Sequence, residues 1–376
     1  MDDAASTVIE HWRQEKGKVD DPISLLLLRA AVLLELAQVR ADYTGLLAGA
    51  RDFIEADPLT DEQRAWLENG MARSMRRDLE TGADPGPIIP GTLATGDDDG
   101  GWTPQGLGYD PATGYLLQTS YHGDQAQLSL VDPDTGALVQ TVQLQPYDDG
   151  QVTMPPPDHA GGVAVHDGIV WVTSSGDPGH VYPYAMSDIT AASPGGPVPV
   201  AQAPQQVSGA AYSTIVGNTM YAGTFNDSGP GELFTYTWDP QSQTWGDEQG
   251  PFPTPEETQG VAVRGNEIVF STSWGRDNGG TLQSYNLGDV TGGGDLGDPL
   301  QTVQLPNMAE GVAMLPQGVL TTYESGAAGY VDPKGNPLEE LWASMNMTVT
   351  PYGDLGLAGL GIDVEPATLH QASQLF

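Results

Sequence analysis

One phrase recurs five times along this chain and constrains its fold more than any other feature. It is a glycine followed by small apolar residues, written QGLGYD, GGVAVHD, SGAAYS, QGVAVRG and EGVAMLP, with its glycines at Gly106, Gly162, Gly209, Gly260 and Gly311. Successive glycines are 56, 47, 51 and 51 residues apart. A self-similar period of roughly 40–50 residues is typical of β-propeller blades, each of which is a small four-stranded sheet.

The residues after each glycine repeat the pattern of a blade. Second apolar segments follow as GYLLQTSY, IVWVTSS, TMYAGTF, EIVFSTSW and GVLTTYES, and third ones as AQLSLVD, HVYPYAM, ELFTYTW, TLQSYNL and AGYVD. Asp-Pro turns then lead to an outer strand, as at Asp132-Pro133, because proline fixes the φ angle that such a turn needs. The glycines suit the innermost strands, which crowd around the axis and leave no room for large side chains.

The sequence therefore predicts a mainly β fold, a five-bladed β-propeller over residues 102–376, preceded by an α-helical module. A sixth, degenerate blade from residues 340–376 is the alternative. Residues 1–82 hold 10 of the 13 basic residues and are predicted to form a helical hairpin or a three-helix module. Thr60-Asp-Glu-Gln63 has the capping-box pattern of a helix start. Residues 83–101 are rich in Pro, Gly and Asp, which predicts a linker.

Composition excludes several classes of function. The formal net charge is −37, and nucleic acids and anionic membranes attract proteins through Lys and Arg, so we expect neither as a partner. The absence of cysteine excludes disulfides, thiolate nucleophiles and Cys-ligated zinc. The apolar run Ile23–Val39 is interrupted by Arg29 and Glu35, so we expect no transmembrane segment. Met1–Thr7 lack the pattern of a secretory signal peptide.

Candidate binding residues lie where a propeller usually builds its central funnel, at the starts of inner strands and the ends of second strands. These positions are rich in acids, amides and aromatic residues, which is typical of a ligand site. The ligand-binding candidates are Gln105, Tyr121, Gln259, Trp274, Arg276, Asp277 and Tyr323. They predict a small molecule, a carbohydrate or a protein as the partner.

Arg276 stands out as one of three basic residues in the predicted propeller. Three interpretations stay open for it. It pairs locally with Asp277, or it crosses the funnel to neutralise Glu310 or Glu324. In the third, its planar guanidinium holds an anionic ligand group and Trp274 provides a stacking wall.

Glu310 is the strongest single functional candidate because it opens an inner strand. A carboxylate buried there requires a cation, an arginine or several hydrogen-bond donors. Glu324 ends the next strand of the same blade and is placed to share a cation or a proton with it. A divalent ion such as Ca²⁺, held by Glu310 and Asn226, would polarise an oxygen or activate water. In that case His122, His159 and Glu324 are the candidate catalytic groups.

Several phrases of the predicted propeller carry a resemblance to known proteins. They are TPQGL (103–107), HAGGVAVHDG (159–168), QGVAV with STSWGRD (259–277), and MAEGVAM with YESGA (308–327). In these phrases the chain resembles a group of exported actinobacterial propeller proteins of undefined activity, over roughly residues 102–335. The resemblance implies the fold and an extracytoplasmic location, although those relatives start with a signal segment where this chain has its helical region.

A looser similarity is to gluconolactonase-like six-bladed propellers, in which a glutamate before an inner-strand glycine binds a divalent metal. Glu310-Gly311 matches that feature. Two functions follow as expectations. The first, which we favour, is a propeller that binds a ligand or partner in an acidic and aromatic funnel, while the helical module serves assembly or export. The alternative is a divalent-metal-dependent hydrolase or lyase with its metal near Glu310.

Overall fold

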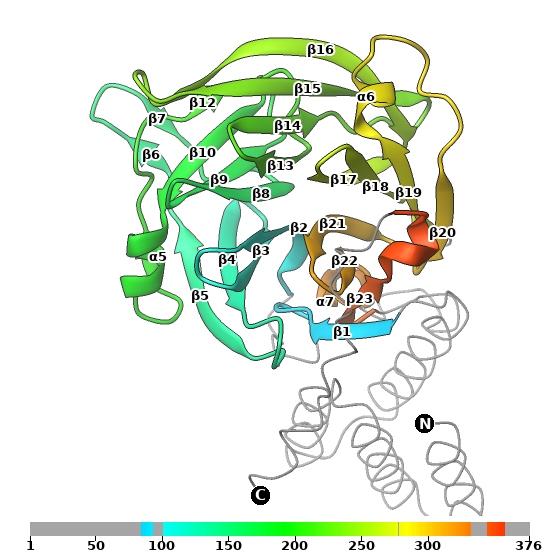
Figure 1. Ribbon diagram of the computed structural model, residues 1–376. Helices are drawn as coiled ribbons and strands as arrows, with labels where there is room; N and C mark the ends of the chain where they lie inside the picture. The colour runs from blue at the N-terminus through cyan, green and yellow to red at the C-terminus, as the bar shows by residue number, and fades with distance from the viewer. Residues whose placement is uncertain (1–83, 93–100, 277, 332–343, 358–376) are drawn as a thin grey trace, which may run out of the picture.

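Five blade-like sheets surround a common axis in the part of the chain that this computed structural model describes, residues 84–92, 101–276, 278–331 and 344–357 (Figure 1). The inner strands of neighbouring blades contact one another, and the fifth contacts the first, so the ring is closed. The mainly β fold and the five-bladed propeller are thus confirmed. The helical module predicted for residues 1–82 lies outside the described residues.

Each blade is an antiparallel sheet whose strands follow one another outward from the axis. The first blade consists of β2 (Thr103–Asp110), β3 (Tyr115–His122), β4 (Gln125–Val131) and β5 (Leu138–Leu144). The second consists of β8 (Gly162–His166), β9 (Ile169–Ser174), β10 (His180–Ala185) and β12 (Gln205–Gln206). The third consists of β13 (Tyr212–Val216), β14 (Thr219–Gly223), β15 (Pro230–Asp239) and β16 (Thr244–Glu256). The fourth consists of β17 (Thr258–Arg264), β18 (Glu267–Thr272), β19 (Gly280–Asn286) and β20 (Gln301–Leu305).

Short elements decorate these blades. They are the parallel strand β11 (Pro197–Val198) beside β5, the hairpin of β6 (Tyr147–Asp148) and β7 (Thr153–Met154), and the helices α5 (Met186–Ala191) and α6 (Leu287–Val290). None of the helices within the described ranges is long and apolar enough to cross a membrane.

The fifth blade joins the two ends of the propeller. Its inner strands are β21 (Ala309–Leu315) and β22 (Gly318–Tyr323), followed outward by β23 (Asn346–Thr350) and β1 (Asp84–Ile88). The pairing of β1 with β23, visible side by side in Figure 1, brings segments more than 250 residues apart into one sheet. Residues 84–88 were expected to be linker, and the structure corrects this because they supply the outermost strand.

The third strand of the fifth blade was also predicted wrongly. The segment AGYVD was expected to be that strand, but residues 328–331 form a short helix, α7 (Ala328–Val331). Local turn bonds join the Ala327 amide to the Glu324 carbonyl and the Tyr330 amide to the Ala327 carbonyl, so this backbone is not available to β22. Residues 346–350, expected in the alternative to belong to a sixth blade, take the place beside β22 instead.

The inner-strand glycines allow close backbone approach between blades. A Cβ atom on Gly311 of β21 would lie 2.7 Å from the carbonyl oxygen of Gln105 in β2. A Cβ atom on Gly260 of β17 would lie 2.8 Å from the carbonyl oxygen of Glu310 in β21. Both distances are shorter than real Cβ contacts, which explains why only glycine suits these positions.

Hydroxyl side chains on second strands bind adjacent blades together, a feature the sequence did not reveal. The Thr119 hydroxyl of β3 donates to the Ala160 carbonyl ahead of β8, at 2.6 Å. The Ser271 hydroxyl of β18 donates to the Glu310 carbonyl of β21. The Thr322 hydroxyl of β22 donates to the Gln118 side chain of β3, at 3.0 Å. These buried bonds satisfy polar groups at the seams between blades.

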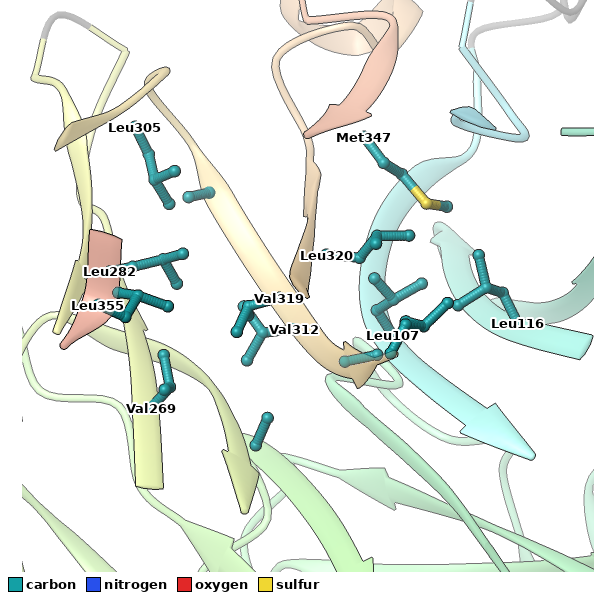
Figure 2. Close-up of a cluster of buried hydrophobic side chains, with 14 of the residues drawn as sticks. Leu107, Leu116, Val269, Leu282, Leu305, Val312, Val319, Leu320, Met347 and Leu355 are labelled. Atoms are coloured by element: carbon teal, nitrogen blue, oxygen red, sulfur yellow. The ribbon is translucent and has the colours of Figure 1, made fainter. Parts of the chain in front are cut away.

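The apolar core is a set of layers between blades, and the fifth blade contributes to two of them. Successive residues of a strand point to opposite faces. Val319 of β22 therefore lies toward Leu282 of the fourth blade, whereas its neighbour Leu320 lies toward Leu107 of the first (Figure 2). All four side chains are buried.

The residues after β23 connect the fourth and fifth blades. The 3₁₀ helix η4 (Tyr352–Leu355) lies there. The Tyr352 hydroxyl donates to the Leu315 carbonyl of β21 at 2.6 Å, and the Ser284 hydroxyl of β19 donates to the Leu355 carbonyl at 2.6 Å. The Arg264 guanidinium of β17 lies 3.7 Å from the centre of the Tyr352 ring.

Substituting Gly311 with alanine tests the crowding at the axis. We expect Gly311→Ala to lower the free energy of unfolding by about 1–3 kcal/mol, because the added methyl must displace backbone atoms of β2. Gly246→Ala is the matched control, since a Cβ at Gly246 of β16 meets no atom within 4 Å; its effect should stay within about 0.5 kcal/mol. Urea unfolding measures both, and equal effects would contradict the account.

Candidate functional site

A group of polar side chains from three blades meets where the fifth blade adjoins the first. We name it the Glu310–Glu324 cluster, and its members are Glu310 of β21, Glu324 after β22, Tyr330 of α7, Gln105 of β2, Tyr121 of β3 and Arg276 in the β18–β19 loop. Five of the six were candidates from the sequence. Tyr330 was missed because its segment was predicted to be a strand, in which it had no reason to reach the inner strands.

Irregular pairing of the inner strands positions two members of this cluster. The register of β2 shifts between Pro104 and Leu107, and that of β21 shifts between Ala309 and Val312. These shifts contain Gln105 and Glu310, each of which directly precedes the inner-strand glycine. A β-bulge re-aims the side chains it contains, and bulges are common beside functional sites. A third shift, between Thr258 and Gly260, contains Gln259.

A left-handed residue precedes the inner strand in three of the blades. His159, Glu257 and Met308 have φ angles of 55°, 61° and 58°, and each lies three positions before its blade's inner-strand glycine. This conformation is costly for residues other than glycine. Its recurrence at equivalent positions shows that the entry turn, and not one side chain, imposes it.

Glu324 is buried and well supplied with hydrogen bonds. Its side chain is 9% exposed. The Gln105 amide nitrogen donates to one of its carboxyl oxygens and also to the Pro104 carbonyl at 3.0 Å. The Tyr330 hydroxyl is a second hydrogen-bond partner of Glu324 and in turn bonds to the Tyr121 hydroxyl. A chain of hydrogen bonds thus runs from the first blade through α7 to the fifth.

Glu310 contrasts with Glu324 because no such donor is found for its carboxyl group among the described residues. Only 4% of it is exposed, yet none of the described residues donates a hydrogen bond to its carboxyl group or lies within 4.0 Å of it as a basic partner. The bond that Glu310 does accept, from Ser271, is to its backbone carbonyl. A buried carboxyl without donors strongly disfavours the ionised form.

The protonation states of the pair follow from this environment. Burial, and then the adjacent charge of Glu324, raise the pKa of Glu310 well above its ordinary value. Burial raises the pKa of Glu324 to about 7, against the opposing effects of the Tyr330 and Gln105 hydrogen bonds and the Arg276 charge. Glu310 therefore keeps its proton to higher pH than an ordinary glutamate, and Glu324 is close to its midpoint at neutral pH.

Arg276 lies within electrostatic reach of Glu324. Its positive charge lowers the Glu324 pKa, and its guanidinium carbon is 4.9 Å from the centre of the Tyr330 ring. No carboxylate in the described part of the chain lies within 4.0 Å of its nitrogens. Its backbone carbonyl accepts a hydrogen bond from the side-chain amide of Asn307. This bond connects the β18–β19 loop to the residues just before β21. The recorded effect of the Arg276 charge is on Glu324, and Asp277 lies outside the described residues, so the three interpretations stay predictions.

Three further binding candidates are not members of the cluster. Gln259 is half-buried and donates to the Ser273 carbonyl at 3.2 Å. Tyr323 is fully buried and shares a hydrogen bond with the Thr348 hydroxyl of β23. Trp274 is exposed, and its ring centre is 5.2 Å from that of Phe225.

The two histidine candidates are exposed. His159 packs its ring against Tyr121, with centroids 4.7 Å apart, and its Nδ1 lies 3.1 Å from the Asp158 carboxylate. His122 lies 6.0 Å from the Trp102 ring, and its Nδ1 lies 3.2 Å from the Gly101 carbonyl. His159 therefore borders the cluster through Tyr121.

The metal interpretation finds no complete ligand set here. Within the described residues no group of three or more His, Asp or Glu side chains is arranged to hold a metal ion. Asn226, expected to be a ligand, donates to the Pro230 carbonyl at 3.0 Å and accepts from the Ser228 amide at 3.1 Å within its own loop. The metal site expected at Glu310 and Asn226 therefore stays a prediction.

Comparisons with known proteins give similarity of low identity. No family model matches the chain, and no curated protein matches it. Among solved structures it is similar to hydrazine synthase of Kuenenia stuttgartiensis, at 10% identity and a TM-score of 0.31 over 59% of this chain and 55% of that one. It thus spans about half the length of that relative.

Two further structures are similar to the chain. The β-propeller domain of Cps50 (Swd1) from Myceliophteria thermophila is 8% identical, with a TM-score of 0.30 over 65% of this chain and 66% of that one. A luciferin-regenerating enzyme is 12% identical, with a TM-score of 0.36 over 68% and 94%. At these scores no activity is transferred, and the resemblance to exported actinobacterial propellers stays a prediction.

The raised pKa of Glu324 predicts a specific pH dependence of stability. The folded protein binds this proton more tightly than the unfolded chain, whose pKa is near the ordinary 4.5. The stabilisation is therefore complete below pH 4.5 and is lost as pH rises toward the folded value of about 7. Glu324→Gln should remove this loss, so its stability relative to wild type should rise across that window by on the order of 3 kcal/mol and then level off.

Urea unfolding at a series of pH values measures this difference. Asp124→Asn, at an exposed carboxylate, is the control for removing one unit of negative charge. The slope against pH is the readout, because a constant cost of the amide does not affect it. Parallel curves for Glu324→Gln and wild type would show that Glu324 ionises normally.

Removing the Arg276 charge should raise the Glu324 pKa further, because that charge favours the carboxylate. We expect the carboxyl ¹³C NMR titration of Glu324 to move to higher pH in Arg276→Met. Arg276→Lys retains the charge and should shift it less. A Glu324 midpoint unchanged by Arg276→Met would place the arginine outside the cluster.

Proposed function

We propose that this propeller binds a polar ligand, or a polar group of a partner, at the Glu310–Glu324 cluster. The observation that carries the proposal is the buried Glu310 carboxyl, to which none of the described residues donates a hydrogen bond. Burying an unpartnered polar group costs free energy, and such groups in native proteins call for an explanation. A ligand that donates hydrogen bonds would supply the missing partner.

The surroundings of Glu310 fit ligand recognition. Gln105 and Tyr330 hold Glu324 by hydrogen bonds, so its position is fixed before any ligand arrives. A fixed set of polar groups reduces the ordering cost of binding. The cluster draws on the first, fourth and fifth blades, and contributions from several blades are what a site in a central funnel requires.

Aromatic side chains extend the proposed site along one end of the propeller. Tyr121, Phe225 and Trp274 all lie at or just after the end of a second strand, in three different blades. Tyr121 packs against His159, and Phe225 packs against the exposed Trp274. Rings of this kind stack on sugars and anchor protein partners. A carbohydrate or polypeptide larger than the cluster itself would contact them, and an extracytoplasmic location, which the resemblance implies, belongs to the same proposal.

A ligand panel tests the proposed function. Neutral sugars, primary amines and small carboxylates are screened by saturation-transfer NMR, and CaCl₂ is screened through the melting temperature. We expect at least one class to bind wild type and to bind Glu310→Gln about tenfold more weakly, since a typical hydrogen bond contributes about 0.5–1.5 kcal/mol and one to a charged group about 1.5–3 kcal/mol. Glu232→Gln, at an exposed position on β15, is the matched control and should bind like wild type.

Two results of the panel would overturn the proposal. One is binding that Glu310→Gln leaves intact, which would place the ligand elsewhere. The other is a complete absence of binding by all classes. A melting temperature raised by CaCl₂ only when Glu310 is intact would instead favour the metal-dependent alternative.

A further inference from the structure

We infer that the group recognised at the Glu310–Glu324 cluster is a primary ammonium, either of a free alkylamine or of a lysine side chain. This inference rests on the proposed function and names its ligand class. The reasons are the inventory of hydrogen-bond acceptors, the charge that the cluster leaves unbalanced and the aromatic faces beside it.

The first reason is the set of hydrogen-bond acceptors in the cluster. Gln105 uses its amide nitrogen for two bonds, to Glu324 and to the Pro104 carbonyl, and this fixes which end of the amide is the oxygen. None of the described residues donates to that oxygen or to the Glu310 carboxyl. The cluster thus presents acceptors from two inner strands. An ammonium group has three donors and no acceptor, so it matches this inventory, whereas a hydroxyl brings one donor and two acceptor lone pairs.

The charge balance of the cluster also favours an ammonium group. When ionised, Glu310 and Glu324 carry two negative charges, and Arg276 is the basic residue of the cluster. One negative charge therefore remains to be balanced. In the unliganded protein a proton balances it, consistent with the raised pKa of both carboxyl groups. A monovalent cation would take the place of that proton without leaving excess charge in a buried site.

Arg276 is not itself the cation that takes the place of this proton. Its guanidinium lies over the Tyr330 ring, and no ion pair within 4.0 Å joins it to a described carboxylate. A divalent metal is a poorer match, because among the described residues no third His, Asp or Glu joins the two carboxyls. A single ammonium group needs only the acceptors that are present.

The aromatic residues provide a surface for the rest of the ligand. Tyr121 is half-buried between the hydroxyl of Tyr330 and the ring of His159. The methylene stem of an alkylamine or lysine packs well on such rings, and the ammonium is attracted to their faces.

Isothermal titration calorimetry tests the inference with defined probes. n-Butylammonium chloride is compared with n-butanol, which has the same shape and no charge, and with tetramethylammonium chloride, which has charge and no N–H donors. We expect n-butylammonium to bind at least about tenfold more tightly than either, the equivalent of one charge-assisted hydrogen bond. Nα-acetyl-lysine amide forms a second arm: tighter binding than n-butylammonium identifies a polypeptide lysine as the source, and weaker binding a free amine.

Variants assign the binding to the cluster. Glu310→Gln should weaken n-butylammonium binding about tenfold or more, while Glu232→Gln leaves it unchanged, and circular dichroism with thermal unfolding confirms that both variants fold. If n-butanol binds wild type as tightly as n-butylammonium and Glu310→Gln abolishes both, the inference fails while the proposed function stands. If n-butylammonium binds wild type and Glu310→Gln equally, or binds neither, the inference is overturned.

Discussion

Close approach of five inner strands around one axis is the constraint on which the rest of this structure depends. At Gly260 and Gly311 a Cβ atom would collide with the backbone of the adjacent inner strand, so backbone contact sets the spacing of the inner strands at these positions. The hydroxyls of Thr119 in the first blade and Ser271 in the fourth then donate to backbone carbonyls of the blade that follows each of them. These short-range contacts leave little freedom for the residue that precedes the glycine.

This restriction explains why candidate polar side chains lie just before the inner-strand glycines. The bulged residues Gln105, Gln259 and Glu310 all occupy the position before an inner-strand glycine. A side chain at this point cannot remain in the regular pleat, and in the fifth blade it is a carboxyl group with no donor among the described residues. The fifth blade, whose inner strand contacts that of the first blade, is also the blade that β1 completes by pairing with β23. Closure of the fold and assembly of the cluster therefore depend on the same pair of blades.

The sequence predicted the features that repeat from blade to blade and missed two features that occur only in the fifth blade. The spacing of the glycines gave the five blades, and the strand ends gave Gln105, Glu310, Glu324 and Arg276 as neighbours of the axis. The closing strand β1 was missed because its residues, DPGPI, have the composition of a linker and only pairing with a distant strand makes them β. Tyr330 was missed for a related reason, since α7 interrupts the fifth blade between its second and third strands.

Glu310 is a buried carboxyl group whose pKa lies well above the ordinary glutamate value, because burial and then the adjacent charge of Glu324 disfavour its ionised form. Isotope-edited infrared spectroscopy measures this directly, by comparing wild type with Glu310→Gln at several pH values above the ordinary glutamate pKa of 4.5. We expect the carbonyl stretch of a protonated carboxyl group in wild type, absent from the variant and diminished when a ligand cation occupies the cluster. A spectrum in which the residue-310 difference shows only carboxylate bands would contradict it.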